Sequence, residues 1–225
     1  MKVAIIGAGT VGKALGRSIA ASGGDVVFAS TGNSAVAAAE SIGARARAVS
    51  GIAEAALGAD VVVLAIPYTA ARNVAEGLAG RVAGKIVIDV TNPLAPDMSG
   101  LATEPGRSAA ENIALWLPGA VVVKAFNTLF ASVQANPKAQ GNLVDALFAT
   151  DDPVAREVVA GLIESMGFRP VWVGGLARAR ELEAMAFLNI ALQMATTGNW
   201  STTFKLVGAP AGALDHRVPI GTGSN

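Results

Sequence analysis

Three glycines near the start of the chain have the spacing of a phosphate-binding turn. Gly7, Gly9 and Gly12 form a G-x-G-x-x-G pattern directly after the apolar run 3–6. In such a turn the first glycine permits a sharp exit from a strand, the second lets the backbone approach a pyrophosphate, and the third lets the next helix pack closely. A helix that begins near Thr10 would point its free N–H groups at that pyrophosphate. The pattern therefore predicts a dinucleotide site.

The loop after the second expected strand, residues 25–29, bears on the choice between NAD and NADP. NAD sites usually carry a carboxylate there, which binds the ribose hydroxyls and would repel a 2′-phosphate. Residues 30–34 read Ser-Thr-Gly-Asn-Ser, with no acidic side chain and no arginine. A neutral loop of hydroxyl and amide groups favours NADP. The alternative is that these residues only turn the chain and cap the next helix.

Polar residues also follow three later expected strands. These exits are residues 67–69, 89–93 and 124–128. Because the carboxyl ends of parallel strands meet at one edge of a sheet, we expect the three exits to converge on the nicotinamide end of the cofactor.

Two charged positions at these exits leave alternatives open. Lys124 could hold an acidic substrate, or act as an acid if burial lowered its pKa. It could equally form an ion pair with Glu111 or Asp89 beneath the site. For Asp89 a structural role, orienting the loop that follows, is favoured. The Asp-Asp-Pro sequence at 151–153 looks like a pair of metal carboxylates but better fits a helix start, with acids in the first turn and proline at the first helical position.

Strand and helix patterns alternate along the chain with short connections. They predict an α/β fold, a Rossmann-type doubly wound parallel sheet with helices on both faces. We expect an NADP-binding Rossmann domain over residues 1–150, a small C-terminal α/β or helical unit over 151–207 and a flexible tail over 208–225. The expected strands are residues 2–6, 25–29, 45–49, 60–66, 86–90, 120–124, 144–149 and 169–173. The expected helices are residues 10–22, 34–42, 51–57, 69–83, 108–116, 153–166 and 177–197.

Composition narrows the classes of function. The 225 residues have zero net charge, no cysteine and a single histidine, His216, which argues against disulfides, cysteine catalysis and histidine-based metal sites. With no basic run we expect no nucleic-acid partner. With no charged leader and no long apolar run we expect a cytoplasmic protein without a membrane partner. The last expected helix is too apolar for one stripe, so it lies either inside the C-terminal unit or partly against a second copy of the chain, and a homodimer is favoured.

Several motifs, taken in order, resemble the NADPH-dependent coenzyme F420 reductase family, which is related to the reductase domain of STEAP-type ferric reductases. The resemblance covers residues 1 to 207 and implies hydride transfer between NADP(H) and the deazaflavin coenzyme F420. Such chemistry needs two rings held face to face and side chains that position them, without proton transfer. Besides the glycines and Pro67, the motifs are Arg-Ser-Ala-Ala-Glu at 107–111, Val-Val-Lys-Ala-Phe-Asn-Thr at 122–128, Thr-Asp-Asp at 150–152, Met-Gly-Phe at 166–168 and the run 175–183.

The resemblance also assigns expected roles by position, with no catalytic residue and no metal ligand. Ser30 and Thr31 would face the 2′-phosphate, where the family usually has Ser-Arg. Ile66 and Pro67 would line the path to the nicotinamide. The residues expected at the pyrophosphate are Gly7, Ala8, Gly9, Thr10, Val11 and Gly12, and those expected around the nicotinamide and the acceptor are Thr91, Asn92, Pro93, Lys124 and Asn127.

Two alternatives to this function stay open at the level of sequence. One is an NADPH-dependent reductase of another small-molecule acceptor, such as a flavin, a ferric chelate or a small carbonyl acid, for which Lys124 would suit an anion. The other is a non-enzymatic module that senses NADP(H) and signals through its dimer.

Overall fold

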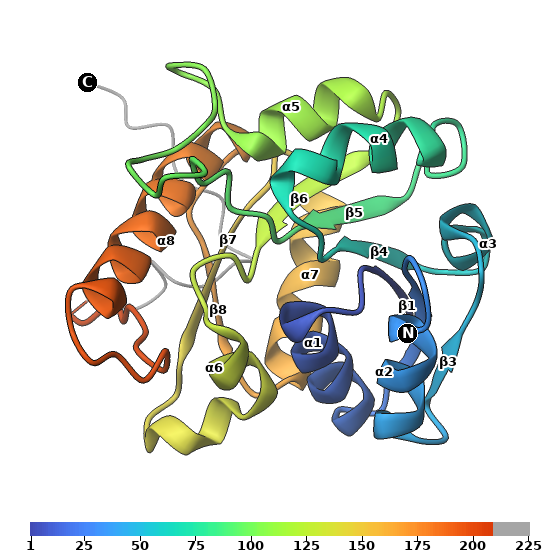
Figure 1. The fold of residues 1–225 in the computed structure, drawn as a ribbon, viewed down its shortest axis with the longest axis horizontal. Helices are drawn as coiled ribbons and strands as arrows, with labels where there is room; N and C mark the ends of the chain where they lie inside the picture. Colours follow the sequence, from blue (N-terminus) through green and yellow to red (C-terminus); the bar gives the residue numbers. More distant parts are fainter. Residues whose placement is uncertain (209–225) are drawn as a thin grey trace.

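The computed structural model describes residues 1–208, except for the side chains of residues 139 and 140. Its centre is one eight-stranded sheet with the strand order β3-β2-β1-β4-β5-β6-β7-β8 (Figure 1). The chain therefore has the Rossmann-type α/β fold that the sequence predicts. The strands are β1 (Lys2–Ile6), β2 (Asp25–Ala29), β3 (Ala46–Ala48), β4 (Val61–Leu64), β5 (Ile86–Asp89), β6 (Val121–Ala125), β7 (Asp145–Ala149) and β8 (Arg169–Trp172).

Helices cover both faces of the sheet, and two apolar cores form because alternate strand residues point to opposite faces. Val3 and Ile5 of β1 pack in the core beneath α1, α2, α6 and α7, whereas Ala4 and Ile6 pack in the core beneath α3, α4 and α5. The helices are α1 (Thr10–Ala21), α2 (Ser34–Ile42), α3 (Ile52–Leu57), α4 (Tyr68–Leu78), α5 (Ala109–Trp116), α6 (Ala131–Ala135), α7 (Pro153–Ser165) and α8 (Ala179–Met194), with the 3-10 turns η1 (Pro137–Gln140) and η2 (Leu176–Arg178).

The expectation of a wholly parallel sheet is wrong at one pair of strands. β7 runs antiparallel to β6, with Lys124 opposite Ala149 and Ala125 opposite Phe148. The connection between them, residues 126–144, holds the five-residue helix α6 and the turn η1. The chain therefore turns at the carboxyl edge of β6 and re-enters the sheet in the opposite direction.

The C-terminal part of the described chain continues the same sheet. β8 lies parallel to β7, with α7 as the crossover. Sequence patterns predicted β7, β8, α7 and α8 within a few residues but missed α6 and η1. The domain division near residue 150 stays a prediction. Most of the expected tail, residues 209–225, and His216 within it lie outside the described residues.

No helix within residues 1–208 is both long enough and apolar enough to cross a bilayer.

Candidate functional site

The three glycines of the first turn occupy three different environments. Gly7 has φ +105°, and a Cβ there would lie 2.1 Å from the carbonyl oxygen of Ala65. A Cβ on Gly12 would lie 2.1 Å from the carbonyl oxygen of Gly7, whereas a Cβ on Gly9 would meet nothing within 4 Å. α1 begins at Thr10, as predicted. Gly7 and Gly12 thus let the strand, turn and helix pack together, while Gly9 leaves open space where a ligand can approach the backbone.

A cleft of about 1040 Å³ opens beside this turn. Seven expected residues line it: Gly7, Ala8, Gly9, Ser30, Thr31, Ile66 and Pro67. The sequence did not indicate its further wall, which consists of Ala48, Val49, Ser50, Ile52, Ala70 and Val74. The lining includes no charged side chain. The combination of free helix N–H groups, open space at Gly9 and an elongated neutral cleft fits a dinucleotide.

The loop at the end of β2 is partly held by its own hydrogen bonds. Ser30 Oγ and Ser34 Oγ lie 2.7 Å apart, and Ser34 Oγ donates to the carbonyl oxygen of Thr31 at 3.2 Å. Asn33, the N-cap of α2, makes no side-chain capping bond. The helix-capping alternative is therefore not what Asn33 does, although the serines do turn the chain.

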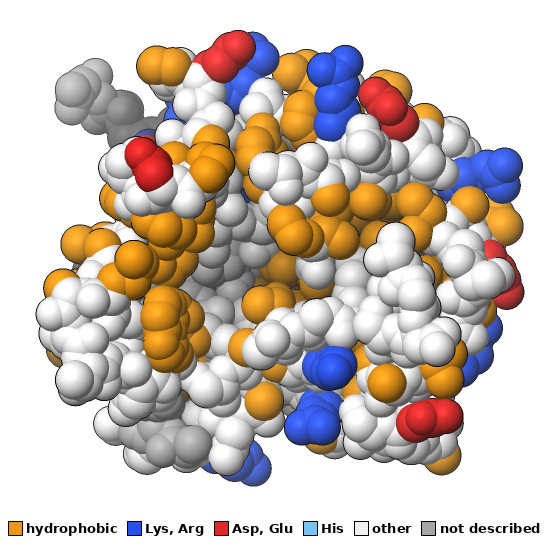
Figure 2. Space-filling model, in the orientation of Figure 1, with side chains coloured by type: hydrophobic (Ala, Val, Ile, Leu, Met, Phe, Trp, Pro, Cys, Tyr) orange, Lys and Arg blue, Asp and Glu red, His pale blue; other side chains and the backbone are white. Residues whose placement is uncertain are grey.

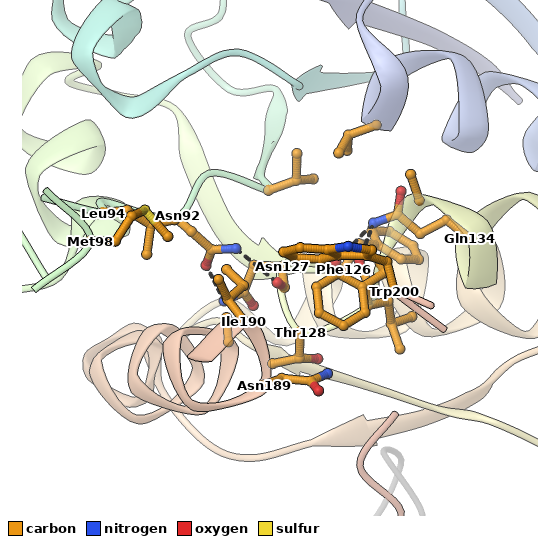
Figure 3. A pocket seen from close by; sticks show the side chains of 16 residues that line it. Asn92, Leu94, Met98, Phe126, Asn127, Thr128, Gln134, Asn189, Ile190 and Trp200 are labelled. Carbon is orange, nitrogen blue, oxygen red and sulfur yellow. Dashed lines mark hydrogen bonds between the residues drawn. The ribbon is translucent and has the colours of Figure 1, made fainter. Parts of the chain in front are cut away.

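A second pocket of about 360 Å³ lies at the carboxyl ends of β5 and β6 (Figure 3). Figure 2 shows a hollow beside α8 with apolar side chains along its rim. Val11, Asn92 and Asn127 are the expected site residues in the pocket. Phe126 and Thr128, which also line it, belong to the strand exit 124–128 expected at the nicotinamide end. Sequence patterns did not indicate the other lining residues, which include Leu94, Met98, Phe130, Gln134, Asn189, Ile190 and Trp200. These residues come from segments far apart in the chain, and none of the residues that line the pocket is charged.

Two paired asparagines join the walls of this pocket. Asn92 Nδ2 donates to the backbone oxygen of Asn127 at 3.0 Å, and Asn127 Nδ2 donates to Asn92 Oδ1 and to the backbone oxygen of Leu182, both at 3.0 Å. These bonds fix the orientation of the Asn127 amide. They connect the loop after β5, the end of β6 and helix α8, so the three elements hold one geometry.

Three buried side-chain oxygens around the pocket have no hydrogen-bond partner within the described protein: Asn127 Oδ1, Thr128 Oγ1 and Gln134 Oε1. Gln134 Nε2 donates to the backbone oxygens of Phe126 and Leu129, at 3.0 and 2.8 Å, which fixes its amide as well. Buried polar atoms are normally satisfied, so a group of unpaired acceptors around one cavity suits a ligand with N–H donors.

Lys124 is fully buried beneath the pocket and already has three acceptors. Its Nζ lies 2.8 Å from Asp89 Oδ2, 2.6 Å from the backbone oxygen of Thr91 and 2.8 Å from Glu183 Oε1. Burial lowers the pKa of Lys124, but Asp89 and Glu183 raise it by more, so the ammonium stays charged. The ion-pair interpretation is confirmed for Asp89. The second partner is Glu183 rather than Glu111, and the lysine lines neither cavity.

Asp89 and Glu183, the two carboxylate partners of Lys124, also accept hydrogen bonds from backbone N–H groups. Asp89 Oδ1 accepts from the N–H of Thr91 at 2.8 Å, which confirms the predicted orienting role for the loop after β5. Glu183 accepts from the N–H groups of Ala109 and Ala110, at 3.0 and 3.4 Å, at the start of α5. Burial raises the pKa of Glu183, and Lys124 offsets only part of that rise. The cluster joins α8 to α5 and to the sheet.

Two helix starts carry the acidic residues that the sequence had singled out. Asp152 is the N-cap of α7 and accepts from the N–H of Ala155 at 2.7 Å, with proline at the first turn, so the capping interpretation is confirmed. Glu111 forms a capping box with Ser108 at the start of α5. A hydrogen bond from Arg180 lowers the pKa of Glu111 to about 2. None of these acids lines either cavity.

The remaining expected site residues lie next to the two cavities without lining them. Thr10 and Gly12 belong to the first turn of α1 and act through its backbone. Thr91 and Pro93 are buried on either side of Asn92. Their contribution is to shape the loop that carries Asn92.

Comparison with known proteins identifies some relatives that match most of the chain and others that match about half of it. The family described as NADP oxidoreductase, coenzyme F420-dependent, matches residues 2–93. The F420-dependent NADP reductase of Methanothermobacter thermautotrophicus is 33% identical over 209 residues, covering 86% of this chain and 90% of that protein. The metalloreductase STEAP3 of Rattus norvegicus is 39% identical over 109 residues, which are 48% of this chain but 21% of the rat protein.

A solved structure shows the same architecture. The crystal structure of a putative F420-dependent NADP reductase from Arthrobacter sp. FB24 superimposes with a TM-score of 0.82 at 27% identity, covering 92% of this chain and 99% of that one. The similarity therefore extends beyond the nucleotide-binding half to the strands and helices around the second pocket.

Proposed function

The chain belongs to the F420-dependent NADP reductase family, and from this premise we propose that it transfers a hydride between NADPH and a conjugated ring acceptor of the deazaflavin or flavin type. It is an NADP-dependent oxidoreductase of the Rossmann class. The identity of the acceptor is the part that we propose.

The position of the two cavities on either side of the glycine turn carries the proposal. Gly9 lines the larger cleft, and Val11, two residues later in the same turn, lines the smaller pocket. A dinucleotide that lies along the glycine turn therefore brings its nicotinamide to the mouth of a neutral, largely apolar pocket. That pocket falls in the size range of small-molecule sites.

In this proposal the protein positions the two reactants and the rings carry the chemistry. The backbone of Gly7, Ala8 and Gly9 holds the pyrophosphate, and Ser30 and Thr31 face the 2′-phosphate. The nicotinamide supplies or takes the hydride, so no side chain has to move a proton at the reacting carbons. Asn92 and Asn127 hold the edges of the pocket at a fixed separation, and the apolar lining excludes water.

The alternative of a reductase acting on a small carbonyl acid depended on Lys124. That ammonium has no exposed surface, and Asp89, Glu183 and the backbone oxygen of Thr91 take its hydrogen bonds. No cationic side chain is among the residues that line the pocket. A small acid whose negative charge lay inside the pocket would therefore lose its hydration without gaining a counter-charge. Because the chain belongs to a family of NADP-dependent reductases, an enzyme is favoured over a non-enzymatic sensor.

Binding and turnover test the proposal separately. We would titrate the purified protein with NADPH and with NADH by calorimetry, then follow NADPH oxidation by absorbance with coenzyme F420 or FMN as acceptor. We expect tighter binding of NADPH and turnover with at least one of the two rings. NADPH binding without turnover on either ring would contradict the proposed acceptor class and leave the cofactor site intact.

We also propose that the protein is a homodimer that packs through α8. Leu188, Leu192 and Met194 on this helix are all more than half exposed, and burying such an apolar face is favourable. Light scattering on the eluting protein tests this. We expect about twice the mass of the chain, and a monomer for Leu188→Glu combined with Leu192→Glu.

A further inference from the structure

Strained backbone gathers at the smaller pocket. Among residues 1–208, the non-glycine residues with φ in the left-handed region are Met98 (φ 60°), Phe126 (φ 62°) and Trp200 (φ 54°), and all three line this pocket. They belong to three separate segments: the loop after β5, the end of β6 and the segment after α8. Left-handed backbone is unfavourable for such side chains and persists only where the surroundings enforce it.

The surroundings enforce it at the first two positions. Phe126 is fully buried, packs edge-on against Phe168 with ring centroids 6.4 Å apart, and its backbone oxygen accepts from Gln134 Nε2. Met98 closes a small loop in which its N–H donates to the backbone oxygen of Ala95 at 2.9 Å. Both residues line the same cavity.

The backbone of Trp200 is held by hydrogen bonds, although this residue is partly exposed. Its N–H donates to Gln193 Oε1 at 2.9 Å, and its backbone oxygen accepts from Ser132 Oγ. Its ring stands edge-to-face on Phe130, with centroids 5.3 Å apart and planes at 82°. The side chain is nevertheless 45% exposed. An indole that is held on both sides of its backbone but left half open provides a rigid platform, so a ligand loses little entropy on binding to it.

The chemistry of the lining defines what this platform takes. The side chains around it are apolar or aromatic, none is charged, and the unpaired oxygens of Asn127, Thr128 and Gln134 can accept hydrogen bonds. We propose that Met98, Phe126 and Trp200 form a preformed clamp for a neutral, planar conjugated ring with N–H donors on one edge, and that Trp200 is the side chain on which this ring packs. The inference deepens the proposed function and rests on it.

Two rings share this chemistry, the nicotinamide of the cofactor and the acceptor ring. The nicotinamide arrives from the glycine turn, on the side of Val11, whereas Trp200 belongs to the segment that closes the pocket after α8. We therefore assign the clamp to the acceptor ring. Separate measurements of the affinity for NADPH and for an acceptor ring distinguish the two assignments.

Calorimetry on the full chain, saturated with NADP⁺, tests the clamp with lumiflavin as an uncharged probe ring. Stacking of a planar base on an aromatic side chain is worth about 1–3 kcal/mol, so Trp200→Ala should weaken lumiflavin binding by roughly fivefold to 150-fold. Trp200→Phe should restore most of the affinity, and the Kd for NADPH should be unchanged in both variants. The matched control is Trp172→Ala, which removes a tryptophan that packs against Arg156 outside the pocket.

A second variant separates ligand binding from folding. Met98→Gly relieves left-handed strain, so it should keep or raise the melting temperature while it weakens lumiflavin binding. A purely structural role for Met98 would change the melting temperature alone. As a probe of charge, anthraquinone-2-sulfonate, a planar ring with a fixed negative charge, should bind much more weakly than lumiflavin.

Three results would overturn the clamp: unchanged lumiflavin affinity in Trp200→Ala, a parallel loss of NADPH affinity, or equal binding of the sulfonated ring. The outcome stays distinct from that of the hydride-transfer proposal. Lumiflavin binding that depends on Trp200, without NADPH oxidation by coenzyme F420 or FMN, supports the clamp and contradicts the proposed reaction. Turnover that is unchanged by Trp200→Ala supports the proposed reaction and contradicts the clamp.

Discussion

The two cavities of this protein are built in contrasting ways. Every residue that lines the larger cleft lies between residues 6 and 74, and the glycine turn contributes backbone to it. The smaller pocket takes its lining from residues between 11 and 200, mostly as side chains on strained or hydrogen-bonded loops. A site that binds through backbone can be encoded by a short local motif, whereas a site built from side chains of distant segments needs the finished fold.

Known relatives of this protein differ in how much of the chain they match. The family match ends at residue 93, and the similarity to the rat metalloreductase covers 109 residues. Residues 2–93 include β1 to β5 and every residue that lines the larger cleft. The F420-dependent NADP reductase of Methanothermobacter thermautotrophicus matches 86% of the chain and the Arthrobacter structure 92%, so these similarities extend to the segments around the smaller pocket.

Lys124→Met should have the largest effect, because this lysine joins the two halves. It would leave the carboxylates of Asp89 and Glu183 buried without their cation, and breaking a buried pair in this way costs about 3–5 kcal/mol. Denaturant unfolding measures the change in free energy. Lys138→Met, an exposed lysine, should change it by less than about 0.5 kcal/mol. A loss below about 1 kcal/mol for Lys124→Met would contradict a structural role of the buried cluster.

Gly9 and Gly12 offer a test of the glycine turn alone. Gly9→Val should keep the melting temperature and weaken NADPH binding more than about tenfold, because its side chain would fill the space open to the pyrophosphate. Gly12→Ala should instead destabilise the fold by about 1–3 kcal/mol, because its Cβ would meet the Gly7 carbonyl oxygen. Calorimetry measures the affinity for NADPH, and thermal melts measure the stability of each variant. Unchanged NADPH affinity in Gly9→Val would remove this turn from the site.

Thr31→Arg should sharpen the cofactor preference of the larger cleft. A charge-assisted hydrogen bond to the 2′-phosphate is worth about 1.5–3 kcal/mol, so the ratio of NADPH to NADH affinity should rise by about tenfold to 150-fold. Thr31→Gln, of similar reach but neutral, is the control and should change the ratio little. No change in the ratio for the arginine variant would mean that the loop after β2 points away from the phosphate.

Glu111→Gln should have the smallest effect and a defined pH dependence. The pKa of this carboxylate is lowered from 4.5 to about 2, so its contribution to stability is present above about pH 4.5 and is lost as the pH falls toward 2. Because Arg180 is nearly half exposed, we expect about 1 kcal/mol at neutral pH. Unfolding at several pH values should show the wild type and the variant converging in acid. A difference that is independent of pH would contradict this account.

The sequence predicted those parts of the site that depend on local patterns. Gly7, Gly9 and Gly12 were assigned their roles from spacing alone, and the structure shows the close contacts and the open space that those roles require. Asp152 could be recognised as a cap because the proline that follows it starts a helix. Strand boundaries were recovered because the central strands are buried on both faces and are therefore continuously apolar.

The parts that were missed depend on contacts between distant segments. Glu183 lies in an apolar helix, and only the fold places Lys124 and the start of α5 beside it. Trp200 and Phe130 are isolated aromatic residues in the sequence, and their contact defines one side of the pocket. The antiparallel direction of β7 is set by its pairing with β6, and the short helix α6 between them has no clear periodic pattern in the sequence.

The spread of the two linings along the chain also fixes the order in which they can appear during protein synthesis. The last residue of the larger cleft, Val74, precedes Trp200 by 126 positions. At about 5–20 residues per second, the ribosome adds the last lining residue of the larger cleft roughly 6–25 s before it adds the tryptophan of the smaller pocket. A nascent chain therefore contains all the lining residues of the cofactor cleft well before those of the second pocket are complete.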